Sequence, residues 1–229
     1  MRTRAMVLVG ASILFASLFT WLGFWQIRRL HEKQKYNDTV ASRRFLPPIS
    51  FDSIPADTLT SRFRRVTLAG TYDYQNQVVW TLRGRDGSPG VNILTPLRRP
   101  GTDTAVLVNR GWVYSPDATR VDLDPWNEAD SLKGDAYILP LHGNRSAEGG
   151  PIRSRSFRSL NLEELRRVFP YPIAPVFAVL TTAPVDSVAN PPRVMLIPLD
   201  EGSHRSYAFQ WFSFAAISII GAVIFTRKT

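Results

Sequence analysis

The chain is apolar at both ends and polar between them. No charged side chain occurs from Ala5 to Trp25 or from Tyr207 to Phe225. With a rise of ~1.5 Å per residue, each stretch is long enough for an α-helix to cross a hydrocarbon layer of ~30 Å. The chain is therefore predicted to span a membrane twice, with one extramembrane domain between the spans. An antiparallel hairpin of these spans would bring the end of the first beside the start of the second.

This pattern predicts four successive parts of the chain. Charged residues and the absence of helix breakers after Trp25 indicate that the first helix continues beyond the membrane and stops before Pro47 and Pro48. The predicted parts are a transmembrane helix at 5–25, a helical extension and linker at 26–46, a β-rich domain at 47–203 and a second transmembrane helix at 207–225.

The middle of the chain is rich in β-branched and aromatic residues separated by turn residues, which is typical of short strands in a small barrel or sandwich. The predicted strands are Val66–Tyr72, Val78–Leu82, Val91–Leu97, Ala105–Tyr114, Ala136–Leu139, Val176–Thr181 and Val194–Leu199. One helix is expected, because Asn161 and Glu164 form a capping pattern before an apolar periodicity that ends at Pro170. The residues from Asp117 to Ala129 and from Gly143 to Ser156 are expected to form exposed loops.

Composition limits the function. The net charge of +9 is scattered along the chain or lies beside the spans, which favours anionic lipid headgroups or acidic small molecules over nucleic acid. The chain contains no cysteine and none of the common hydrolase, phosphate-binding or dinucleotide-binding motifs, so an enzyme is not expected. The acidic run from Asp122 to Asp130 lacks the glycine of a calcium loop and is predicted to be solvated.

The charges at the ends of the chain indicate its orientation. Arg2 and Arg4 precede the first span, and Arg227 and Lys228 follow the second, which favours cytoplasmic termini. The residues after Trp25 offer no small-residue cleavage site, so the first span is expected to remain as an anchor. A bacterial inner membrane is predicted, with the main domain in the periplasm.

Polar and aromatic side chains gather where the two spans would meet. His204, Tyr207 and Trp211 share the spacing of one helical face, and Trp25, Gln26 and Arg28 come from the first helix. An aromatic belt at the membrane interface accounts for the indole and phenol rings alone. A haem site would also account for the histidine and the arginine. The imidazole would bind the iron, the flat rings would lie against the porphyrin, and the arginine would pair with the propionates.

Five segments carry a resemblance to a known family. They are Leu22-Gly23-Phe24-Trp25-Gln26-Ile27-Arg28 with Lys33, Gly70-Thr71-Tyr72-Asp73, Thr95-Pro96-Leu97, Val108-Asn109-Arg110-Gly111-Trp112-Val113, and His204 with Tyr207-Ala208 and Gln210-Trp211-Phe212. In this order they resemble the motifs of the Surfeit locus protein 1 family. The resemblance spans the chain but is poor in the acidic loop and from Gly143 to Ser156.

The resemblance implies a non-enzymatic assembly factor for haem-copper cytochrome c oxidase. It implies transient binding of haem a, with His204 as the axial ligand of the iron. The residue types at the same end of the spans lead us to expect Trp25, Gln26, Arg28, Tyr207 and Trp211 around the cofactor. The implied partners are the catalytic subunit of the oxidase, other oxidase assembly factors and the lipid bilayer. The alternative is a haem-independent membrane scaffold that stabilises a nascent oxidase subunit. Around His204 the chain has Gly202-Ser203-His204-Arg205 where the family often has Asn-x-His-Leu.

Overall fold

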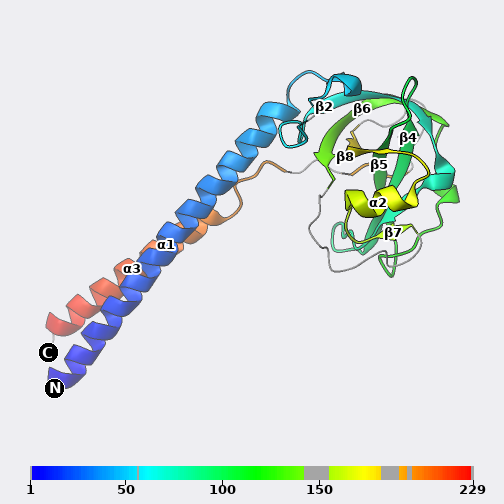
Figure 1. Ribbon diagram of the computed structural model, residues 1–229. Helices are drawn as coiled ribbons and strands as arrows, with labels where there is room; N and C mark the ends of the chain where they lie inside the picture. Colours follow the sequence, from blue (N-terminus) through cyan, green and yellow to red (C-terminus); the bar gives the residue numbers. More distant parts are fainter. Residues whose placement is uncertain (1, 56, 142–154, 182–190, 195–197, 228–229) are drawn as a thin grey trace. The chain divides into compact units, whose positions relative to one another are not determined.

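The computed structural model describes residues 2–55, 57–141, 155–181, 191–194 and 198–227. These residues fold into two compact units, one of Met1–Ala41 with Pro198–Thr229 and one of Ser42–Ile197 (Figure 1). The helices are α1 (Arg2–Arg44), α2 (Leu162–Val168) and α3 (His204–Arg227), with short 3₁₀ turns at Phe51–Ser53, Tyr74–Asn76 and Asp124–Trp126. The strands are β1 (Ile49–Ser50), β2 (Arg65–Tyr72), β3 (Val78–Trp80), β4 (Gly90–Arg98), β5 (Ala105–Tyr114), β6 (Ser131–Pro140), β7 (Ser156–Phe157) and β8 (Ile173–Leu180).

The first unit is an antiparallel pair of long apolar helices. Met6–Arg44 and His204–Arg227 are both long and apolar enough to cross a membrane, and the two chain ends lie at the same end of the pair (Figure 1). The predicted antiparallel pair of long apolar helices at the two ends of the chain is thus confirmed. Helix α1 ends at Arg44, before Pro47 and Pro48, as the sequence predicted. Which turns of α1 and α3 lie inside the bilayer stays a prediction.

Small side chains let the two helices approach each other. The buried side of α1 includes Ala16 and Leu30, and that of α3 includes Ala208 and Ala215. Gly23 faces Phe212 so closely that an added Cβ would lie 2.5 Å from the phenylalanine ring. Close backbone approach of this kind drives helix association in lipid, where apolar burial gives no preference for a protein partner.

The second unit is built on a small β-barrel. Its sheet runs in the order β1-β2-β6-β8-β5-β4-β3-β7, and an additional pairing between β2 and β4 closes the circuit β2-β6-β8-β5-β4. The β5–β8 pair is parallel, whereas the other pairs in the circuit are antiparallel. At the closure, Thr71 pairs with Arg98 and Tyr72 with Leu97. The β-rich fold predicted from the sequence is confirmed as a barrel with three further strands: β1 pairs with β2, β3 pairs with β4, and β7 pairs with β3.

Alternate side chains along the strands point inward and fill the barrel with apolar groups. One contiguous cluster contains Leu68, Leu97, Val108, Ile138 and Ala178, all at most 1% exposed. Helix α2 begins at Asn161, whose side-chain oxygen accepts hydrogen bonds from the amides of Glu163 and Glu164, as the capping pattern predicted. Leu165 of α2 is fully buried.

Six of the predicted strands correspond to β2, β3, β4, β5, β6 and β8. Strand β5 has the predicted bounds, and the ends of β2, β3 and β4 differ from the prediction by at most two residues. The largest differences are at β6, which begins at Ser131, and at β8, which begins at Ile173. The seventh predicted strand, Val194–Leu199, includes residues 195–197, which lie outside the described residues, and no strand is assigned to its other residues. Most of the predicted Gly143–Ser156 loop also lies outside the described residues.

The prediction of a solvated acidic loop is wrong at Glu128. Its carboxylate is 4% exposed and lies 3.4 Å from the Nη1 atom of Arg110 and 2.7 Å from the Nη2 atom of Arg193. Three apolar side chains of the same loop, Val121, Leu123 and Trp126, pack against a second buried cluster. Spacing in the sequence could not show this, because the two arginines that pair with Glu128 come from distant segments.

Arg110 is the centre of this buried polar network. Its guanidinium is fully buried and donates to Thr95 Oγ1 (2.8 Å), Gln77 Oε1 (2.7 Å) and the carbonyl oxygen of Trp126 (2.6 Å). The Tyr72 ring lies 5.6 Å from the guanidinium, and burial raises the pKa of the Tyr72 phenol, so that this neighbour is neutral at physiological pH. Arg110 therefore ties the 3₁₀ turn after β2, strand β4 and the acidic loop to β5.

Candidate functional site

A hydrogen bond joins the two helices at the start of α3. The Nδ1 atom of His204, the first residue of α3, lies 2.8 Å from the Oε1 atom of Gln26 on α1. Gln26 is 9% exposed, and His204 is half-buried. The sequence placed both residues at this membrane boundary, and the structure brings their side chains into direct contact.

With Oε1 of Gln26 facing Nδ1, the contact is a hydrogen bond in one tautomer of the imidazole. The carbonyl oxygen of a glutamine side chain can only accept a hydrogen bond, so the hydrogen lies on Nδ1 and His204 donates it. The Nε2 atom of the neutral ring then keeps its lone pair, on the side of the ring away from Nδ1. A histidine oriented through one nitrogen and open at the other is the usual arrangement of a metal ligand.

Gly202 leaves space beside that open nitrogen. A Cβ added at Gly202 would lie 3.7 Å from Cδ2 and 3.9 Å from Nε2 of His204, so a larger side chain there would occupy this space. The residue has φ +67°, a conformation that favours glycine, and its amide donates to Oδ1 of Asp200 at 3.0 Å. Glycine at position 202 therefore places no side-chain atom beside Nε2 of His204.

Two more amide side chains of α1 hold the segment before α3. Asn37 Nδ2 donates to the carbonyl oxygen of Asp200, and Gln34 Nε2 donates to Oε1 of Glu201, both at 2.8 Å. These contacts set where α3 begins and hence where the imidazole of His204 lies. Sequence reasoning missed Gln34 and Asn37. The available signal was their position on the same side of α1 as Gln26, at helical spacing.

The predicted aromatic residues divide into two groups. Trp25 is 37% exposed and Tyr207 47% exposed, and among the described residues neither makes a hydrogen bond or ring contact with His204. Trp211 packs within the helix pair, with its ring stacked on Phe19 at a centroid distance of 5.7 Å and edge-on to Phe214 at 6.0 Å. The role of all three beside a cofactor stays a prediction.

The arginines after the first span also differ from each other. Arg29 forms an ion pair with Glu32 at 2.7 Å, whereas Arg28 is exposed and forms no ion pair within the described part of the chain. The guanidinium of Arg28 is therefore available to an external anion. Glu201, near the start of α3, pairs with Arg205 at 3.3 Å.

Comparison with known proteins identifies the family to which these features belong. A sequence model of the SURF1 family matches residues 13–216, which include most of α1, the β domain and the first half of α3. The chain is 24% identical to a SURF1-like protein of Rickettsia felis over 235 residues, covering 100% of this chain and 98% of the relative.

Two eukaryotic relatives match over shorter stretches. The cytochrome oxidase assembly protein SHY1 of Saccharomyces cerevisiae is 28% identical over 140 residues, covering 58% of this chain and 36% of the yeast protein. Surfeit locus protein 1 of Takifugu rubripes is 29% identical over 107 residues, covering 40% of this chain and 45% of the fish protein.

Proposed function

Because the chain belongs to the SURF1 family, we propose that it is an assembly factor for haem-copper cytochrome c oxidase which binds haem a and helps to deliver it to the catalytic subunit. The assembly role is supported by the yeast relative, whose name states that it is a cytochrome oxidase assembly protein. In this proposal haem a is a cargo, and the protein is not an enzyme.

The contact between His204 and Gln26 carries the haem proposal. The hydrogen bond at 2.8 Å holds Nδ1 and leaves Nε2 as the atom that would coordinate the iron. Gly202 keeps the space near Nε2 free of a side chain. The residues present therefore fit a haem with one axial histidine from this chain.

The surrounding side chains would serve the rest of the cofactor. Arg28 has a guanidinium without an ion-pair partner among the described residues and would hold a propionate. Trp25, Tyr207 and Trp211 would shield the apolar faces of the macrocycle. A single axial ligand from the protein favours exchange, because the partner needs to replace only one bond to the iron during transfer.

The proposal places the protein in a bacterial inner membrane with the β domain on the periplasmic side. The support is the two apolar helices, the arginines and lysine outside them, and the similarity to Rickettsia proteins. Other oxidase assembly factors and the catalytic subunit are the proposed partners.

Replacement of His204 by alanine is expected to abolish haem binding while leaving the fold intact, because the side chain is only half-buried and its loss removes one hydrogen bond. The measurement is the absorption spectrum of detergent-purified protein from cells that make haem a, with circular dichroism to check the fold. Ser206→Ala is the matched control, since Ser206 is an exposed residue of the same helical turn.

Two results would contradict the haem proposal. Retention of the haem a spectrum in His204→Ala would show that His204 is not the ligand. If the wild-type protein carries no haem although haem a is available, the haem-independent scaffold becomes the better explanation of the oxidase assembly role. Co-purification with the catalytic subunit would then be the property to measure.

Replacement of Gln26 by leucine is expected to weaken haem binding by about tenfold without abolishing it, because the imidazole remains but loses the group that orients it. Titration of the purified apoprotein with haem a measures the affinity. Gln210→Leu is the control, because it makes the same change at an exposed position of α3. Equal affinities of Gln26→Leu and the wild type would show that the hydrogen bond does not position the ligand.

A further inference from the structure

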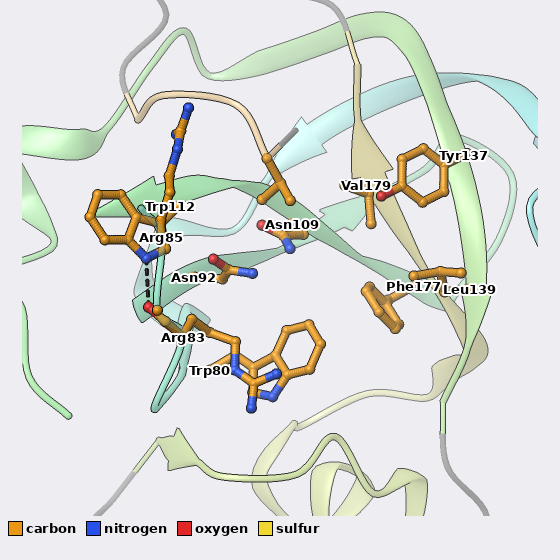
Figure 2. Close-up of a pocket in the computed structure, with 12 residues that line it drawn as sticks. Trp80, Arg83, Arg85, Asn92, Asn109, Trp112, Tyr137, Leu139, Phe177 and Val179 are labelled. Atoms are coloured by element: carbon orange, nitrogen blue, oxygen red, sulfur yellow. Dashed lines mark hydrogen bonds between the residues drawn. The ribbon is translucent and has the colours of Figure 1, made fainter. Parts of the chain in front are cut away.

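A second candidate site lies in the β domain, on the outer face of the barrel. A pocket of about 330 Å³ is formed by strands β3, β4, β5, β6 and β8 together with the residues after β3 (Figure 2). Its lining residues are Trp80, Arg83, Gly84, Arg85, Asn92, Asn109, Trp112, Tyr137, Leu139, Phe177, Val179 and Val194. None of these residues belongs to the proposed haem site.

Strand register explains why these side chains converge. Asn92 on β4 lies directly opposite Trp80 on β3 and Trp112 on β5, so the three side chains form one row on one face of the sheet. Val179 on β8 lies opposite Asn109 and Tyr137 and forms a second row. The residues adjacent to the second row, including Val108 and Ala178, point into the barrel core.

An irregularity in β5 joins the two rows. Asn109 and Trp112 are three residues apart and would point to opposite faces of a regular strand. The β4–β5 register shifts between Ile93 and Leu94. Ile93 pairs with Gly111 and Leu94 pairs with Asn109, so Arg110 is an extra residue without a partner on β4. Arg110 therefore turns into the buried network, while Asn109 and Trp112 both face the pocket.

The polar groups of the pocket are incompletely satisfied. Asn109 is 2% exposed, and its Oδ1 atom has no hydrogen-bond partner within the described residues. Asn92 is 6% exposed, and no hydrogen bond of its side chain is found in the same part of the chain. Both side chains point toward the centre of the pocket in Figure 2. Leaving a buried polar atom unpaired is costly, so a ligand that donates a hydrogen bond to Oδ1 of Asn109 would gain affinity.

The charged groups of the pocket are both cationic. Arg83 lies over the Trp80 ring with its Cζ atom 4.4 Å from the centroid, and burial lowers the pKa of its guanidinium. Its Nε atom donates to the carbonyl oxygen of Thr81 at 3.1 Å. The Cζ atom of Arg85 lies 5.8 Å from the Trp112 centroid. Within the described residues, its one ion pair is a loose contact of 3.7 Å with the exposed Asp86. The described lining contains no acidic residue.

The tryptophans are held rigidly at the edge of this pocket. Trp112 Nε1 donates to the carbonyl oxygen of Arg83 at 2.7 Å, and Trp80 Nε1 donates to that of Arg158 at 3.2 Å. The Trp80 ring meets Phe177 edge-on at 5.8 Å. Flat apolar walls, fixed in advance, favour a flat apolar ligand.

We propose that this pocket binds a small planar aromatic carboxylate that also carries an O–H or N–H donor. The rings of the ligand would lie among Trp80, Trp112 and Phe177, its carboxylate would pair with Arg83, and its donor would satisfy Oδ1 of Asn109. The volume of about 330 Å³ limits the ligand to the size of a few fused rings. This site is independent of the haem proposal, since it involves other residues and another chemistry.

The test uses 6-hydroxy-2-naphthoate, a planar probe with a carboxylate at one end and a hydroxyl donor at the other. The full chain is placed in lipid nanodiscs, and binding is followed by the probe's fluorescence, with empty nanodiscs as the blank. Two related probes separate the interactions: 6-hydroxy-2-naphthamide lacks the negative charge, and 6-methoxy-2-naphthoate lacks the donor. The affinity of each probe is measured for the wild type and for the variants Arg83→Gln, Arg166→Gln and Asn109→Leu.

Arg83→Gln is expected to weaken binding of the hydroxynaphthoate by roughly ten- to hundredfold, because a charged hydrogen bond is lost. The same variant should leave binding of the naphthamide nearly unchanged. Arg166→Gln is the matched control, because it removes an equal charge from an exposed residue of α2. Asn109→Leu should weaken the hydroxynaphthoate by about threefold to tenfold but not the methoxynaphthoate.

Several results would overturn the proposal. One is the absence of binding at millimolar probe concentrations. Another is equal binding to Arg83→Gln, Arg166→Gln and the wild type, which would place the probe elsewhere. Binding of a peptide with an aromatic C-terminal residue, in the absence of naphthoate binding, would identify the pocket as a protein-docking site instead. Loss of haem binding in His204→Ala has no bearing on these outcomes.

Discussion

Replacement of Glu128 by glutamine is expected to destabilise the β domain by about 3–5 kcal/mol, because it leaves the buried guanidinium groups of Arg110 and Arg193 without the carboxylate between them. Glutamine has nearly the same shape, so the change isolates the charge. The Glu128 side chain is 4% exposed, and that of Arg110 is fully buried, so water cannot compensate for the loss.

Amide hydrogen exchange of the detergent-solubilised full chain measures this effect within the β domain alone. Peptides from β4 and β5 should lose protection by about two to nearly four orders of magnitude, since ~1.4 kcal/mol corresponds to a factor of ten. Asp124→Asn makes the same charge change at an exposed position of the same loop and should have little effect. Equal effects of the two substitutions would mean that Glu128 is solvated.

Replacement of Gly70 by alanine is expected to destabilise the barrel by about 3 kcal/mol, near the upper end of the usual cost of overpacking. An added Cβ would collide with the backbone carbonyl oxygen of Arg98, where β2 and β4 close the barrel. A backbone atom within a paired strand cannot move aside as a flexible side chain can. The close approach of β2 and β4 therefore requires glycine at this position.

The midpoint of denaturation by guanidinium chloride, followed by exchange protection in β2 and β4, tests this expectation. Gly84→Ala is the control, because the nearest atom to an added Cβ there is the Ser88 carbonyl oxygen at an ordinary 3.8 Å. If Gly70→Ala were as stable as the wild type, β2 and β4 could move apart at the barrel closure without loss of stability. That result would also remove the packing reason for glycine in the Gly70-Thr71-Tyr72-Asp73 segment.

Gly70 and Arg110, the partner of Glu128, lie in segments that resemble family motifs, and the structure gives physical reasons for both residues. Gly70 permits closure of the barrel, and Gly23 permits close contact between the helices. Arg110 anchors a buried network, whereas Trp112, two residues later, lines an outer pocket. Side chains on both faces of β5 therefore come from one segment, Val108-Asn109-Arg110-Gly111-Trp112-Val113. Packing in the buried network explains Arg110, but it does not explain why Asn109 and Trp112 line the outer pocket.

The amino-acid sequence was sufficient to predict the two membrane helices, the intervening β-rich domain and the helix capped by Asn161. Each depends on a local or periodic property: a long uncharged stretch, alternation along a strand, or a side chain that caps its own helix. The placement of His204 and Gln26 near each other also followed from the sequence, because a hairpin of two spans must bring those positions to one end.

The tertiary structure alone decided how individual side chains are used. The burial of Glu128 depends on arginines that are close only in space, and the pocket on the outer barrel face depends on the register of five strands and on the extra residue in β5. The choice of Nδ1 as the bonded nitrogen of His204 depends on the packing of α1 against α3. Such contacts are set by the relative positions of distant segments, which residue periodicity along one segment does not determine.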